Sequence, residues 1–82
     1  MKLYNLDGKL IKKTYDCPHK FTGITESSYG TKIWYFNGNR HRIGGHAVEW
    51  GNGTKEWWID NKSVTEQQHA LLVDIMKLKG LT

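Results

Sequence analysis

The side chains best suited to hold a metal ion are four histidines and a single cysteine. Cys17 and His19 are two positions apart, and His41 and His46 are five apart. A Cys-x-His pair with two further His could form a four-ligand zinc site. However, one Cys falls short of the usual structural zinc patterns, and His41 belongs to a repeated phrase. We therefore expect no metal and no other cofactor.

Carboxylates and serines offer little support for catalysis. Glu49 and Glu56 stand on the two arms of a predicted hairpin, but a catalytic pair needs a cleft in which one carboxyl has a raised pKa. Ser27 and Ser28 lack the strand-turn-helix context of an activated nucleophile. The glycines occupy hairpin turns rather than a phosphate-binding loop. Without an acid–base or nucleophile constellation, we predict that the protein is not an enzyme.

Basic and aromatic residues favour binding instead. The chain has 12 Lys and Arg against 8 Asp and Glu, a net charge of +4. Phosphate contacts need such charges, and aromatic side chains on an outer sheet face can stack bases. The candidate residues for nucleic-acid or partner binding are Lys12, Lys13, Lys20, Lys32, Tyr35, Arg40, His41, Arg42, Lys55 and Trp58. Two structural alternatives stay open, namely charges that protect a sheet edge and aromatics that form an apolar layer or a dimer contact.

These residues are positioned by a repeat. The phrase at residues 29–39 returns at residues 52–62 with an offset of 23, so that Trp34 recurs as Trp57. A fixed period indicates one supersecondary unit used repeatedly. The turn signals Asp7-Gly8, 28–30 and 51–53 predict hairpins within residues 1–13, 21–36 and 46–60, and Asn37-Gly38 is the clearest hairpin turn of the chain. Residues 39–43 make up a short, polar segment that is predicted to form an edge strand or a loop-like strand, protected by its charges.

Alternation along the strands assigns two faces to the predicted sheet. The predicted core face carries Trp34, Phe36, Val48, Trp50, Trp57 and Ile59. The predicted outer face carries Ile33, Tyr35, Ala47, Glu49, Glu56 and Trp58. Tyr35 and Trp58 hold equivalent places in the repeat, so we expect them to form an outer aromatic pair.

The C-terminal residues 65–79 predict a helix. Thr65 and Gln68 have the spacing of a capping box, and Gly80 is suited to end the helix. An apolar stripe is formed by Leu71, Leu72, Ile75 and Leu78, and Val73 and Met76 widen it. We expect its first three members to pack on Trp34, Trp50 and Trp57. The predicted fold is a single α+β domain of residues 1–82, in which β-hairpin repeats (1–62) form an antiparallel meander sheet with one face covered by this single helix.

The repeated phrases carry a resemblance to a known family. Residues 34–42, 45–50 and 53–58 resemble the small MORN-like repeat proteins of tailed bacteriophages, whose repeats read roughly W-Y-x-N-G-K-x-H-R-x-x-G-P-A-x-E-W. The resemblance is strong over residues 29–62 and weak over 1–28. His46 stands where the family usually has Pro, and Asn39 where it has Lys. The resemblance implies hairpin repeats and often a phage origin, and it does not imply an enzyme.

Together these features lead to two functional hypotheses. The first is a small phage-type accessory protein that binds RNA or other nucleic acid as a counter-defence factor, for example as an inhibitor of a host toxin–antitoxin ribonuclease. The alternative is a protein–protein interaction module that inhibits a host protein through an aromatic sheet face. Self-association is a further option. Because the chain has no bilayer-spanning apolar run, no signal peptide and one Cys, we expect it in the host cytoplasm, away from membranes.

Overall fold

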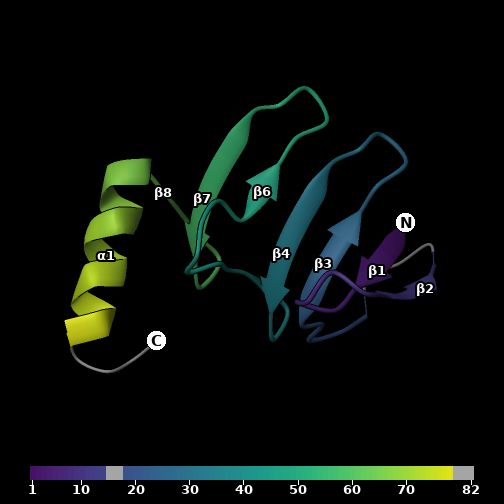
Figure 1. Cartoon of the computed structure of the whole chain (residues 1–82), viewed down its shortest axis with the longest axis horizontal. Coiled ribbons are helices and arrows are strands. Elements are labelled where there is room, and N and C mark those ends of the chain that lie inside the picture. The colour runs from purple at the N-terminus through teal and green to yellow at the C-terminus, as the bar shows by residue number, and fades with distance from the viewer. Residues whose placement is uncertain (15–17, 79–82) are drawn as a thin grey trace.

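An antiparallel meander sheet and one C-terminal helix make up the fold, as a computed structural model of residues 1–14 and 18–78 shows (Figure 1). The elements are β1 (Lys2–Tyr4), β2 (Leu10–Lys13), β3 (Gly23–Glu26), β4 (Lys32–Phe36), β5 (Asn39–Arg40), β6 (Val48–Glu49), β7 (Lys55–Ile59), β8 (Lys62–Val64) and α1 (Glu66–Leu78). The strand order is β2-β1-β3-β4-β6-β7-β8, and β5 pairs with β4. The predicted α+β class is therefore confirmed.

Two tight turns of the same kind mark the repeat. Asn37 and Gly38 have φ of 52° and 84°, which is the positive-φ pair that a two-residue hairpin turn requires. Asp60 and Asn61, 23 positions later, have φ of 47° and 67° and join β7 to β8. The strand β8 is absent from the sequence-based prediction. It forms because the repeat continues through one more hairpin arm.

The segment that follows β4 is short and loop-like, as predicted, but it does not lie at an edge, so that part of the prediction for residues 39–43 is wrong. The backbone N–H of Arg42 donates to the carbonyl of Trp58 (3.2 Å), and that of Asn61 donates to the carbonyl of Arg40 (2.9 Å). The segment therefore lies between β4 and β7. β6 fills the same place at the other end of these two strands. The basic side chains here do not serve to guard an open sheet edge.

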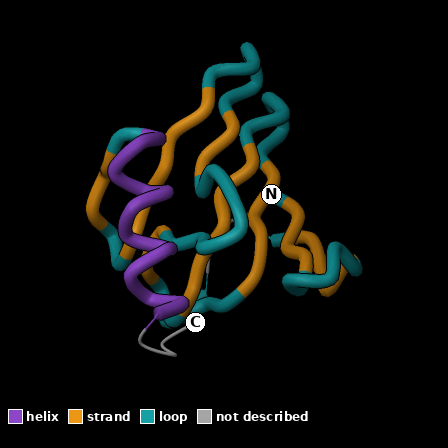
Figure 2. Tube along the Cα trace, turned by 60° about the vertical axis from the view of Figure 1, so that its left-hand side comes forward, coloured by secondary structure: helices purple, strands orange, loops and turns teal. Residues whose placement is uncertain are grey.

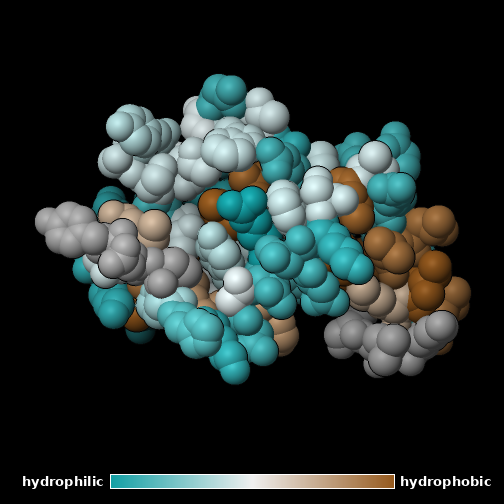
Figure 3. Space-filling model, turned by 180° about the vertical axis from the view of Figure 1, so that it is seen from behind, coloured by the Kyte–Doolittle hydropathy of each residue, from teal (hydrophilic) through white to brown (hydrophobic). Residues whose placement is uncertain are grey.

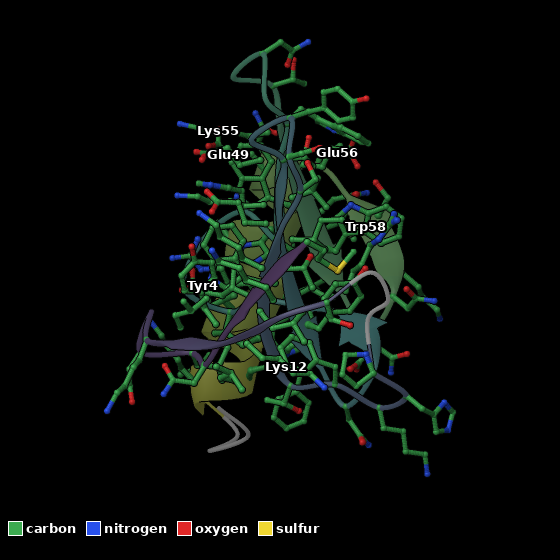
Figure 4. All side chains as sticks on the ribbon, turned by 90° about the vertical axis from the view of Figure 1, so that its right-hand side faces the viewer. Tyr4, Lys12, Glu49, Lys55, Glu56 and Trp58 are labelled. Carbon is green, nitrogen blue, oxygen red and sulfur yellow. The ribbon has the colours of Figure 1, made fainter. Side chains whose placement is uncertain are left out.

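The strand register fixes which residues share a face. Ile33 is paired with Val48, and Val48 is paired with Glu56. Directly paired residues of antiparallel strands point to the same side of a sheet. Figure 4 shows the consequence, with Glu56 on one side of the sheet and Glu49 on the other.

The predicted faces are therefore wrong for one strand. Val48 and Trp50 lie on the side away from the helix, and Ala47 and Glu49 lie on the helix side. The physical reason is the break at residues 44–45. The chain bends there, and the alternation counted from β4 loses its phase before β6 begins.

The start of the helix follows the predicted capping box. The backbone N–H of Gln68 donates to Thr65 Oγ1, and the backbone N–H of Thr65 donates to Gln68 Oε1, both at 3.0 Å. These bonds satisfy N–H groups that the first helical turn leaves free. The predicted helix end at residues 79–80 lies outside the described residues.

The helix turns only part of the predicted apolar stripe to the sheet, namely the part around Val73. Its buried residues are His69 and Val73. His69 Nε2 donates to the carbonyl oxygen of Arg42 (2.6 Å), which ties α1 to the segment beside β7. The exposed apolar residues are Leu71 (63%), Ile75 (41%) and Leu78 (88%). α1 lies at the β7 end of the sheet rather than across its middle (Figures 1 and 2), and apolar side chains of this end are visible in Figure 3.

This orientation predicts that truncation of a side chain lowers the stability of the protein at Val73 but hardly at Leu71. Val73→Ala should lower the free energy of unfolding by about 1–3 kcal/mol, because it leaves a gap under the helix. Leu71→Ala should change it by less than about 0.5 kcal/mol, because the side chain faces water. Urea denaturation of both variants measures the difference. A larger loss for Leu71→Ala would show that Leu71, and not Val73, packs on the sheet.

No helix within residues 1–14 and 18–78 has both the length and the apolarity needed to cross a membrane.

Candidate nucleic-acid interface

Five residues form a continuous group on the sheet side away from α1, which we call the aromatic face: Tyr35, Arg40, Trp50, Glu56 and Trp58. Arg40 of β5 pairs directly with Tyr35 of β4. The Cζ atom of Arg40 lies 4.9 Å from the ring centroid of Trp58. A guanidinium stacked in this way is held in place and still has N–H groups for a ligand.

A carboxylate at the centre of the aromatic face fixes two indole rings. Trp50 Nε1 donates to Glu56 Oε2 at 2.6 Å, and Trp58 Nε1 donates to Glu56 Oε1 at 2.9 Å. The bond from Trp50, followed by that from Trp58, lowers the pKa of Glu56. Arg40 adds to this effect, and partial burial opposes it. The carboxylate is therefore ionised at neutral pH, and both rings are oriented before any ligand arrives.

The lowered pKa of Glu56 predicts a loss of stability in acid. A group with a depressed folded-state pKa stabilises the fold above its unfolded-state pKa, near 4.5, and this stabilisation disappears as pH falls through the folded-state pKa. The unfolding free energy of the wild type should therefore fall more steeply below pH 4.5 than that of Glu56→Gln. Denaturant titrations across this pH range measure it, with Asp74→Asn as control. Parallel pH profiles for wild type and Glu56→Gln would show that the bonds from Trp50 and Trp58 to the Glu56 carboxylate do not stabilise the fold.

Three of the predicted site residues lie on the opposite side of the sheet. The strand register places Lys13 beside Lys2, Lys2 beside Glu26, Glu26 beside Lys32, Lys32 beside Glu49, and Glu49 beside Lys55. Lys13, Lys32 and Lys55 thus belong to a charged row on the helix side. Because carboxylates interrupt this row, it is less attractive to a polyanion than its lysines suggest. The structure does not bring these lysines together with Arg40.

The other predicted residues are spread around the molecule. Lys12 pairs with Leu3 and lies on the same side of the sheet as Trp58, although on a distant strand (Figure 4). The backbone of Lys20 lies against Gly38 at the hairpin turn. His41 and Arg42 line a pocket on the helix side. Four of the ten predicted residues therefore share one side: Lys12, Tyr35, Arg40 and Trp58.

Tyr35 and Trp58 do not stack on each other as expected. The ring of Tyr35 instead meets that of Phe21, with centroids 6.4 Å apart. Arg40 stands between the two repeat-related aromatics, since it pairs with one and covers the other. The expected aromatic pair is replaced by an aromatic–arginine–aromatic arrangement.

His46 packs between two tryptophans. Its ring is edge-on to Trp34 and to Trp57, with centroids 5.4 and 6.2 Å away. Burial, followed by the charge of Arg42, lowers the pKa of His46. The ring is therefore neutral at pH 7 and fills the space between Trp34 and Trp57. Within residues 1–14 and 18–78, no three His, Cys, Asp or Glu side chains gather as metal ligands, and Cys17 lies outside these ranges.

Sequence reasoning missed Trp50 and Glu56 as site residues. Trp50 was assigned to the core because the phase of β6 was counted through the bend at residues 44–45. The spacing of Trp50 and Glu56 around the turn at residues 51–53 could have indicated that these two residues lie close together. Trp50 precedes this hairpin turn and Glu56 follows it, so the turn brings the two residues together. Trp58 is two residues after Glu56 and therefore lies on the same side of β7.

No protein-family model, curated protein or solved structure matches this chain.

Proposed function

We propose that the protein binds single-stranded nucleic acid, RNA in the first place, through the aromatic face. The observation that carries the proposal is the guanidinium of Arg40, which is stacked on Trp58. Arg40 is also the residue of β5 that pairs with Tyr35 in the strand register. Successive bases stack on aromatic side chains irrespective of sequence, and each stacked base contributes about 1–3 kcal/mol. The free N–H groups of Arg40 suit a phosphate or a base edge, and Lys12 offers a second cation on the same side.

The biological role that fits this binding is non-enzymatic. The MORN-like resemblance suggests a phage accessory protein, and an RNA-binding protein of this kind can act as a counter-defence factor. Inhibition of a host toxin–antitoxin ribonuclease is the concrete form of this proposal. It is supported by the resemblance and by the net charge of +4, which favours polyanionic partners.

Affinity purification from a bacterial lysate, with and without nuclease, tests the proposal. We expect RNA to be recovered with the tagged protein and to be released as salt is raised from about 50 to 300 mM, because phosphate contacts are salt-dependent. An Arg40→Gln variant should recover less RNA, whereas Lys55→Gln, on the opposite side of the sheet, should recover the wild-type amount. Equal loss in both variants would indicate a general charge effect and would contradict the assignment to the aromatic face.

A protein partner is the second candidate, and Glu56 is the observation that favours it. Its carboxylate lies at the centre of the aromatic face and would repel phosphate. Tyr, Trp and Arg are also the residues most enriched at binding hot spots of protein interfaces. A partner retained after nuclease treatment and at about 300 mM salt, and lost with Trp58→Ala, would support this candidate over the first.

A further inference from the structure

A pocket of about 570 Å³ opens on the helix side, and of the aromatic face only Tyr35 contributes to its lining. Trp34 and Phe36 of β4 contribute to its lining, together with Leu6, Ile43 and Met76 from three other segments. Tyr35, His41, Arg42 and Asp60 complete it. A mainly apolar pocket of this size with a few polar groups is suited to a small organic ligand.

The apolar part of this pocket is open to water. Phe36 and Leu6 each have 54% of their surface exposed. Met76, from α1, is half-buried and faces the same space. An aromatic ring placed among these three side chains would remove apolar surface from water on all of them, which is favourable in proportion to the area buried.

Arg42 supplies the positive charge of the pocket. Its Cζ lies 4.2 Å from the ring centroid of Trp34, and its Nη1 donates to the carbonyl of His46 at 3.1 Å. Among the described residues, no carboxylate lies within ion-pair distance of this guanidinium. An arginine presents five N–H donors, so most of them remain for an anion.

His41 supplies a second donor. The backbone N–H of Asp60 donates to His41 Nδ1 at 3.0 Å, so the proton of the neutral ring lies on Nε2. The ring of His41 is 5.8 Å from that of Phe36. The carboxylate of Asp60 lies 3.5 Å from His41 Nδ1, but this side chain is 73% exposed at the rim, where solvent screens its charge.

We infer that this pocket binds an aromatic carboxylate. The ring would lie over Phe36, between Leu6 and Met76. The carboxylate would accept N–H bonds from Arg42, with His41 Nε2 as an additional donor. Charge-assisted bonds of arginine with a carboxylate are stronger than neutral ones, so the charge of the ligand should contribute strongly to its affinity. This inference is independent of nucleic-acid binding, since none of the residues it uses except Tyr35 belongs to the aromatic face.

An NMR titration of the nitrogen-15-labelled protein with 2-naphthoate tests the inference, with the neutral 2-naphthalenemethanol as matched control. We expect saturable amide shifts at Leu6, Phe36, Ile43 and Met76. The acid should bind at least about tenfold more tightly than the alcohol. Equal affinities, no saturation at millimolar ligand, or shifts centred on the exposed helix residues Leu71 and Leu78 would overturn the inference.

Variants separate the pocket from the aromatic face. Arg42→Gln should weaken naphthoate binding about tenfold and leave binding of the alcohol unchanged. Arg40→Gln should alter neither. If Arg42→Gln does not fold, the comparison of acid and alcohol on the wild-type protein still decides the question. A single-stranded oligonucleotide should not displace naphthoate, so failure of this inference and failure of the proposed function give different results.

Discussion

Replacing Gly23 by alanine should unfold the protein or destabilise it by more than about 3 kcal/mol. Gly23 has φ of 149°, a region that side chains rarely adopt. A Cβ at this position would lie 2.3 Å from the carbonyl oxygen of Tyr4 and 2.6 Å from Cζ of Phe21. The first clash is with the backbone of β1, which is paired with β3 at this point and cannot move without breaking the sheet. Thermal melting followed by circular dichroism measures the effect.

Gly44→Ala is the matched control. A Cβ on Gly44 would meet no atom within 4 Å, so this variant should melt close to the wild type. A chain this small has little stability to lose, so the contrast should be large. A wild-type melting curve for Gly23→Ala would mean that β1 does not pair with β3 at Tyr4.

Truncation of Trp58 should have the largest effect on binding. Trp58→Ala removes a stacking surface and the support of Arg40, and we expect single-stranded RNA to bind about 10–100-fold more weakly, which corresponds to about 1–3 kcal/mol. Lys55→Ala is the control, because Lys55 lies on the same strand but on the other side (Figure 4). Its effect should stay below about threefold, the loss expected for one distant charge.

Fluorescence anisotropy of a labelled oligonucleotide measures both variants. Circular dichroism must first show that Trp58→Ala keeps its fold, since the side chain is half-buried. If Lys55→Ala weakens binding as much as Trp58→Ala does, the nucleic acid contacts the charged row on the helix side, and our assignment of the binding surface fails.

Local signals in the sequence were sufficient for turns and for the start of the helix. Asn37-Gly38 specifies its own turn, because both residues tolerate positive φ. Thr65 and Gln68 specify the helix start through bonds within one turn of the chain. The repeat also contained a strand that we did not predict, since Asp60-Asn61 takes the place of Asn37-Gly38 in the second copy.

Long-range choices could not be predicted in the same way. The bend at residues 44–45 changes which residues of β6 point to each side of the sheet, and the local sequence does not specify the size of this change. The side that the helix buries depends on the bond of His69 to the carbonyl of Arg42 and on the space beside Trp57. The helix has apolar residues around much of its circumference, so helical spacing also placed Leu71 and Ile75 in the stripe, although both are exposed.

In the candidate site, too, some features could be predicted from the local sequence and others depend on long-range contacts. The repeat predicted that Tyr35 and Trp58 lie on one outer face, and the strand register supports this. The partner that connects them, Arg40, was among the candidates, but its position between β4 and β7 depends on bonds to the later strand. The lysines were the weakest part of the prediction, because net charge does not indicate on which side of a sheet each charge lies.

The most direct test of the proposed function is an NMR titration of the labelled protein with a single-stranded oligouridylate of about ten nucleotides at low salt. Our account predicts saturable shifts on the aromatic face, at the amides of Tyr35, Arg40 and Trp58 and at the indole N–H groups of Trp50 and Trp58, with their reversal as salt is raised. Shifts confined to Lys32, Glu49 and Lys55, or no shifts at all, would contradict it.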